Sequence, residues 1–144
     1  MKIAIGADHA GYDFKSKVIQ FLESLGHTVV DCGSNTEDSS DYPDYAHKVA
    51  DLVSENKIDQ GVLICGSGIG MSMAANRHPN VRSFVCNNTD IAKLARQHNN
   101  ANIICFGTRI TDFDTIKSCL KTFFETEFEG GRHQRRVNKI ERGQ

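Results

Sequence analysis

The chain has 144 residues, of which 39% are hydrophobic and 24% are charged, as expected for one globular domain with a core of its own. Its 17 basic and 18 acidic residues leave a formal net charge of −1, which argues against a nucleic-acid-binding protein, because such proteins need a basic excess. No apolar run approaches the roughly 18 residues of a membrane-spanning helix, and the N-terminus does not have the pattern of a signal peptide.

The cysteine pattern indicates a reducing compartment. The chain has five cysteines, an odd number, and no two of them have the C-x-x-C spacing. No group of His and Cys residues has the spacing of a zinc finger or of an H-E-x-x-H metal site. We therefore expect a cytoplasmic protein without a metal ion.

Short apolar segments alternate with amphipathic segments from one end of the chain to the other. The first kind predicts strands at 2–7, 27–31, 61–65, 81–86 and 102–106. The second kind predicts helices at 12–25, 43–55, 71–77, 89–98 and, from a cap at Thr111 or Asp112, to about 128. A basic segment, predicted as a helix at about 131–142, carries five basic residues and one acidic residue.

This alternation is typical of an α/β fold. We expect one domain over residues 1–144, a three-layer Rossmann-like sandwich with a five-stranded parallel sheet in the order 2-1-3-4-5. Ligands of such folds bind beyond the carboxyl ends of the strands, at the switch between strands 1 and 3. The loops to consider are therefore Asp8–Gly11 and Cys65–Gly70.

The second of these loops contains three glycines in five residues, at Gly66, Gly68 and Gly70. Glycines there let backbone N–H groups turn toward a phosphate or an oxyanion at the start of a helix. The sequence does not match two common nucleotide-binding motifs. The dinucleotide motif G-x-G-x-x-G requires glycine where this chain has Met71, and the Walker A motif requires lysine where it has Tyr12. NAD and ATP are disfavoured, and we expect no cofactor.

Several side chains beside these loops have the chemistry of a proton-transfer site. Cys65 could act as a thiolate base near a helix N-terminus, although a buried apolar role is equally consistent with its position. Asp8 and His9 could bind sugar hydroxyls or a phosphate, and His98 could act as a general acid or only stabilise a helix end.

Arginines supply candidate phosphate ligands. Arg132 and Arg136 are four residues apart and share a face if the tail is helical, and Arg109 follows the fifth strand. We expect all of these groups to lie along one rim of the sheet. The set contains a candidate base, a candidate acid, backbone amides for an oxyanion and cations for a phosphate. This combination predicts proton transfer next to a carbonyl in a small phosphorylated molecule.

The chain resembles type B ribose-5-phosphate isomerases, a family that includes isomerases of galactose 6-phosphate and allose 6-phosphate. Six ordered blocks carry the resemblance: GADHAG (6–11), DYPDYA (41–46), ICGSGIGMSMAANR (64–77), RQHNNANI (96–103), FGTR (106–109) and EGGRHQRRV (129–137). Another branch of the family has a Glu where this chain has Met71 and lacks the cysteine at position 65.

The resemblance implies a role for each matching residue. Cys65 would be the base, and His98 and Ser67 would assist ring opening, with His98 as the proton donor. The backbone of Gly66, Ser67, Gly68, Ile69 and Gly70 would stabilise an enediolate. The remaining ligands of the substrate would be Asp8, His9, Asn99 and Arg109, with Arg132 and Arg136 on the phosphate.

The resemblance also implies a homodimer or a dimer of dimers, with each site completed across the subunit interface. The GGRHQRRV tail, from which galactose-6-phosphate isomerases depart, favours a pentose substrate. The competing interpretations are a hexose 6-phosphate isomerase, a non-catalytic sugar-phosphate-binding protein and, remotely, a redox protein. No nucleic acid or membrane is an expected partner.

Overall fold

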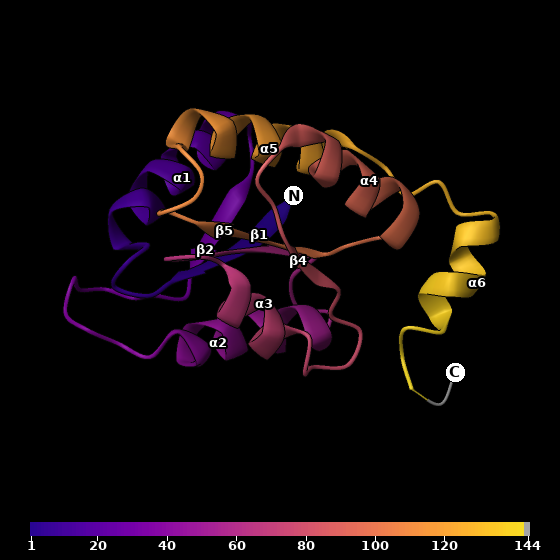
Figure 1. Cartoon of the computed structure of the whole chain (residues 1–144), viewed down its shortest axis with the longest axis horizontal. Helices are drawn as coiled ribbons and strands as arrows, with labels where there is room; N and C mark the ends of the chain where they lie inside the picture. The colour runs from indigo at the N-terminus through magenta and orange to yellow at the C-terminus, as the bar shows by residue number, and fades with distance from the viewer. Residues whose placement is uncertain (143–144) are drawn as a thin grey trace.

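Five parallel strands form one sheet between two layers of helices in the computed structural model, which describes residues 1–142 (Figure 1). The strands are β1 (Lys2–Ala7), β2 (Thr28–Asp31), β3 (Gln60–Cys65), β4 (Ser83–Val85) and β5 (Ile103–Gly107). The helices are α1 (Tyr12–Ser24), α2 (Tyr42–Ser54), α3 (Ile69–Ala75), α4 (Thr89–Asn99), α5 (Phe113–Glu125) and α6 (Arg132–Asn138). The predicted α/β sandwich is confirmed. Residues 143 and 144 of the predicted domain lie outside the described residues.

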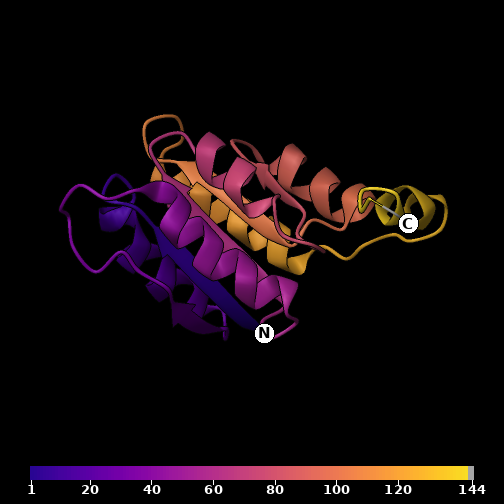
Figure 2. The same cartoon turned by 90° about the horizontal axis from the view of Figure 1, so that it is seen from below.

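Alternation of side chains along each strand builds a core on both faces of the sheet. On one face, Ile64 and Phe106 pack with side chains of α1, α4 and α5. On the other face, Leu63, Cys65 and Cys105 pack with side chains of α2 and α3. Figure 2 views the molecule from the side of α2 and α3, which lie across that face of the sheet. Cys65 therefore points toward α3.

The predicted strand order 2-1-3-4-5 is wrong at one edge, because the sheet has the order β2-β1-β3-β5-β4. All five residues of β5 are buried, so this strand belongs between two neighbours, where both of its faces are covered. All three residues of β4 are only half-buried, which suits an edge strand. The predicted switch between β1 and β3 is unaffected, since these two strands are neighbours and Ala7 pairs with Ile64.

Local capping explains where the later helices begin. Asn88 accepts a hydrogen bond from the Ile91 amide (2.9 Å), and Asp112 accepts one from the Thr115 amide (2.8 Å). Asp112, one of the two predicted caps, is therefore the one that begins α5. That helix ends at Glu125 instead of near 128, and α6 occupies seven residues of the segment predicted to be helical.

The corrected strand order predicts unequal costs for two phenylalanines. Phe106 lies in β5 and is completely buried, whereas Phe84 lies in the edge strand β4 and is half-buried. We expect Phe106→Ala to lower the free energy of unfolding by about 3–5 kcal/mol, and Phe84→Ala to lower it by clearly less. Urea unfolding of both variants measures the difference, and equal losses would contradict the central position of β5.

Candidate active site

A cleft of about 690 Å³ opens at the carboxyl edge of the sheet, where the loops after β1, β3 and β5 meet. Its volume is in the range of small-molecule sites. It is lined by predicted site residues from all three loops, namely Asp8, His9, Cys65, Gly66, Ser67, Ile69, Gly70 and Arg109. The first and third strands thus bring together the two loops that the sequence indicated, and β5 adds a third.

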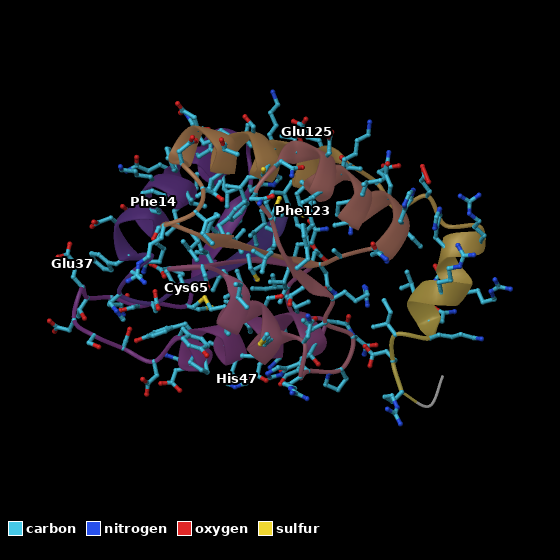
Figure 3. The ribbon with its side chains drawn as sticks, in the orientation of Figure 1. Phe14, Glu37, His47, Cys65, Phe123 and Glu125 are labelled. Atoms are coloured by element: carbon cyan, nitrogen blue, oxygen red, sulfur yellow. The ribbon has the colours of Figure 1, made fainter. Side chains whose placement is uncertain are left out.

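Cys65 lies at the inner end of this cleft, on the side of the sheet covered by α2 and α3 (Figure 3). The Gly68 amide donates a hydrogen bond to its sulfur (N···Sγ 3.0 Å). An amide aimed at the sulfur favours negative charge on that atom. The side chain is 5% exposed, so the sulfur is shielded from water while it still borders the cleft. Cys65 thus belongs both to the buried core on this face of the sheet and to the border of the cleft.

The glycine loop keeps its shape because two positions exclude side chains. Gly68 has φ +82°, a left-handed conformation that disfavours other residues. At Gly107 in β5, a Cβ atom would lie 2.5 Å from the Ser67 backbone. The loop can therefore cross close above β5.

Asp8 and His9 are fixed by the backbone around them. Asp8 Oδ1 accepts hydrogen bonds from the amides of Ala10 (2.9 Å) and Gly11 (3.2 Å), so part of this carboxylate shapes the first loop. His9 Nδ1 accepts a hydrogen bond from the Ser40 amide (3.1 Å). With Nδ1 used as an acceptor, Nε2 carries the proton and is the nitrogen that can donate to a ligand.

Arg109 contributes the positive charge of the cleft. A Cβ built on Gly66 would lie 3.3 Å from Arg109 Nη1, so the guanidinium lies directly against the glycine loop. The Arg109 amide also donates to the Gly66 carbonyl oxygen (3.1 Å). The side chain and the backbone of this arginine thus both belong to the same loop junction.

Sequence reasoning missed four further residues that line the cleft: Ala10, Tyr42, Met73 and Ile110. The Tyr42 ring occupies the space that a side chain at Gly70 would need, with Cε2 2.5 Å from a Cβ built there. Tyr42 belongs to the block DYPDYA, which was one carrier of the family resemblance, so a signal for it was present. Met73 lies in the block of residues 64–77 and Ala10 in the block GADHAG, so the same signal was present for both, whereas Ile110 lies outside all six blocks.

The other predicted site residues do not reach this cleft in the same chain. His98 and Asn99 end α4, at the edge of the sheet where β5 begins, whereas Cys65 pairs with Gly107, where β5 ends. The five residues of β5 separate these edges by about 13 Å at a strand rise of 3.3 Å per residue. The expectation of a single rim is therefore wrong for one chain, because α4 runs back along the sheet before β5 starts.

Arg132 and Arg136 lie with that second group. They belong to α6, which packs against α4 and stands at the far end of the molecule from Cys65 (Figures 1 and 3). The Glu129 amide donates to the Gln97 carbonyl oxygen (3.1 Å) and ties this segment to α4. His98, Asn99, Arg132 and Arg136 thus form a separate group, the α4/α6 group.

The α4/α6 group includes a histidine that sequence analysis had not singled out. The rings of His98 and His133 are stacked, with centroids 4.3 Å apart and an interplanar angle of 12°. Burial, the neighbouring His98 and the Arg132 guanidinium lower the pKa of His133 below the usual value for histidine. Glu129 Oε1 lies 3.6 Å from Nε2 of each of the two histidines.

Cys65 lines the cleft, whereas the neighbouring Cys105 is completely buried. Cys105 lies under the cleft, and burial and the neighbouring Cys65 raise its pKa far above the usual range. It stays a neutral thiol at physiological pH. The cleft therefore combines one sulfur that accepts an amide hydrogen bond, a glycine-rich loop, an arginine and an imidazole, which together suit proton transfer on a small anionic substrate.

The fold and this cleft define an α/β protein with the features of an isomerase site, and comparison with known proteins identifies the family. The sequence profile described as Ribose/Galactose Isomerase matches residues 3–140. Ribose-5-phosphate isomerase B of Escherichia coli is 40% identical over 139 residues, covering 96% of this chain and 93% of that protein. The chain belongs to the Ribose/Galactose Isomerase family, as the motifs predicted.

Solved structures agree with this assignment. Ribose-5-phosphate isomerase B of Clostridium thermocellum superposes with a TM-score of 0.95 at 44% identity and covers 97% of this chain and 95% of its own. The enzyme of Thermotoga maritima superposes with a TM-score of 0.93 at 47% identity, covering 96% of each chain. Within residues 1–142, no helix has the length and apolar character needed to span a membrane.

The geometry of the glycine loop predicts a selective effect of Gly68→Ala. Its Cβ would lie 3.0 Å from the Phe106 backbone in addition to the strain of a positive φ. We expect the loop to shift and isomerase activity on ribose 5-phosphate, the substrate in the names of these relatives, to fall by about 10²-fold or more.

Gly26→Ala is the matched control, because Gly26 also has a positive φ (+92°) but no atom lies within 4 Å of its added Cβ. It carries a similar backbone strain of about 1–2 kcal/mol without a change in the cleft. Thermal unfolding and steady-state rates of both variants separate the two effects. An equal loss of activity in both would contradict the role of the loop.

Proposed function

We propose that this chain is an aldose–ketose isomerase that interconverts ribose 5-phosphate and ribulose 5-phosphate, with Cys65 as the base. The observation that carries the proposal is the Cys65 sulfur at the inner end of the cleft, 3.0 Å from the Gly68 amide and next to a loop of further amides. A thiolate there would remove the proton from C2 of the open-chain aldose. The electron pair of that C–H bond moves into a C1–C2 double bond, and the carbonyl π electrons pass to oxygen.

The resulting enediolate needs donors for its developing charge. Amides of Gly66–Gly70 are the candidates, and one such donor contributes about 2.7–4 kcal/mol in comparable oxyanion sites. A proton then passes from the C2 hydroxyl to O1, the Cys65 thiol returns its proton to C1, and the C2 oxygen collapses to the carbonyl of the ketose, so no external oxidant or reductant is consumed. Asp8, His9 and Arg109 would hold the sugar in place while the proton moves.

The remaining roles need a second chain. We assign ring opening to His98 with help from Ser67, substrate contact to Asn99, and phosphate binding to Arg132 and Arg136. Within one chain the α4/α6 group is at the opposite edge of the sheet from Cys65. A second copy whose α4/α6 group covers the cleft would complete the site.

Exposed apolar side chains at the cleft support such a cover. Ile69, Met73 and Ile110 are 48%, 65% and 57% exposed, although all three border the cleft. Apolar side chains gathered in this way mark an interaction surface. A two-fold homodimer uses the same pair of surfaces twice and so yields two equivalent sites. The single domain, acting as a dimer or a dimer of dimers, would work in the cytoplasm, where its five free cysteines stay reduced.

A hexose 6-phosphate is the second candidate substrate, because the family description includes galactose as well as ribose. The GGRHQRRV tail, from which galactose-6-phosphate isomerases depart, favours the pentose. The ratio of kcat/KM for ribose 5-phosphate to kcat/KM for allose 6-phosphate decides between the two. We expect the ratio to exceed one.

Replacement of the base tests the mechanism directly. Cys65→Ala is expected to lower kcat by about 10²–10⁴-fold or more while ribose 5-phosphate still binds, because the amides and charged ligands remain. Cys32→Ala is the matched control, since Cys32 is a half-buried cysteine outside the cleft. Calorimetric titration gives the affinity and a coupled assay gives kcat. A Cys65→Ala enzyme with near-normal kcat would remove Cys65 as the base.

The shared site predicts complementation between two inactive variants. A mixed dimer of Cys65→Ala and His98→Asn chains contains one site that has both native groups, so we expect partial recovery of activity. Differently tagged chains are coexpressed, and the doubly tagged dimer is purified and assayed. A doubly tagged dimer of two Cys65→Ala chains is the control. A mixed dimer without activity, or a chain that sediments as a monomer, would contradict the shared site.

A further inference from the structure

Three potential metal ligands converge between α4 and α6. Nε2 of His98 and Nε2 of His133 each lie 3.6 Å from Glu129 Oε1, and the three ligand atoms all lie within 4.8 Å of one another. The two imidazole rings are stacked, with planes 12° from parallel, and Nε2 of each ring lies near the same carboxylate oxygen. The residues are 31 and 4 positions apart in sequence, so no local spacing motif could have indicated the cluster.

The separations fit ligands around a metal ion better than hydrogen-bonded partners. An N–H···O hydrogen bond is about 2.7–3.2 Å long, so 3.6 Å is too great for a good one. Two ligand atoms about 2.0–2.1 Å from a tetrahedral zinc ion are about 3.4 Å apart. The distances to Glu129 suit one ion, but the lone pairs of two nearly parallel rings do not converge, so one imidazole must rotate about its side-chain torsions when the ion binds.

Backbone contacts hold the ligands in place before any ion arrives. The Glu129 amide donates a hydrogen bond to the carbonyl oxygen of Gln97, the residue before His98. The His133 amide donates one to the Gly130 carbonyl oxygen (3.0 Å). His133 is 9% exposed, whereas the side chains of His98 and Glu129 are 40% and 49% exposed. The site is thus anchored on one side and open to solvent on the other.

The ligand set selects the kind of ion. Two imidazoles and one carboxylate are the protein ligands of many zinc sites that keep a fourth position open. Mg²⁺ and Ca²⁺ prefer all-oxygen sites and gain little from imidazole. Arg132 and Arg136 lie on the same helix as His133, and their positive charge repels cations. An ion that binds here must therefore form coordinate bonds with the imidazoles, as transition metals do.

We propose that His98, Glu129 and His133 form a binding site for one Zn²⁺ or a similar transition-metal ion, which acts as an inhibitor of the enzyme. The ion occupies Nε2 of His98, so this imidazole can no longer give or accept a proton at that nitrogen. The inhibitory effect rests on the proposed function of His98, whereas the binding of the ion does not. The metal is a regulator here and takes no part in the isomerisation.

Metal binding is tested first in the Cys65→Ala chain, which lacks the thiol that could hold zinc in the cleft. Zn²⁺ is titrated by calorimetry, and Co²⁺ is titrated by the visible absorption that a four-coordinate ion produces. We expect one ion per chain, with an affinity that falls by more than about tenfold on adding Glu129→Gln or, independently, His133→Asn. An excess of Mg²⁺ is expected not to compete.

A second imidazole–carboxylate cluster supplies the matched control. His47 Nδ1 lies 2.7 Å from His78 Nε2, and His78 Nδ1 lies 3.1 Å from Asp51 Oδ1. His78→Asn removes the middle of that cluster and is expected to leave the affinity unchanged. Absence of binding, equal affinity in the Glu129→Gln chain, or loss of binding in the His78→Asn chain would each overturn the proposed site.

Inhibition is then measured in chains that keep Cys65, each relative to its own metal-free rate. We expect Zn²⁺ to inhibit the native enzyme and to inhibit the Glu129→Gln enzyme only at concentrations more than about tenfold higher. Confirmed binding without inhibition would refute the role of His98 as proton donor and leave the metal site intact. Equal inhibition of both enzymes would refute the regulatory part of the proposal.

Discussion

Backbone hydrogen bonds between the end of β3 and the segment after β5 set the shape of the cleft. The Thr108 amide donates to the Cys65 carbonyl oxygen (2.9 Å), and the Arg109 amide donates to that of Gly66 (3.1 Å). The first bond extends the pairing of β3 with β5, and the second ties the turn after β5 to the start of the glycine loop, so together they fix where that loop leaves the sheet. The position of the Cys65 sulfur, the direction of the Gly68 amide and the location of the Arg109 guanidinium all depend on this junction.

The division of the charged groups between two ends of the sheet has a physical consequence. The cleft holds a sulfur that gains from nearby amides, and only one arginine lines it, whereas Arg132 and Arg136 stand on α6 at the other end. A dianionic phosphate near a sulfur anion would disfavour that anion unless cations lie between them or beside the phosphate. Supplying these cations from a second chain would link substrate binding, activation of the base and assembly of the dimer.

Much of this architecture could be predicted from the sequence because its signals are local. Apolar runs marked the strands, Asp112 was one of the two residues predicted to begin the last long helix, and the loops after β1 and β3 were correctly placed side by side. The order of the last two strands was not local information. It depends on which of the two strands buries more apolar surface when both of its faces are covered. The wholly buried β5 occupies the inner position, and the short β4 forms the edge.

Contiguous motifs such as ICGSGIG and GGRHQRRV identified the family, and the alternation of apolar and amphipathic segments identified the α/β fold. Two features became visible only in three dimensions: His98 and Arg132 lie at the opposite edge of the sheet from Cys65, and His98, Glu129 and His133 meet. The reason is geometric. A helix that returns along a parallel sheet places its end beyond the far edge, and a contact between distant segments depends on packing that no short motif records.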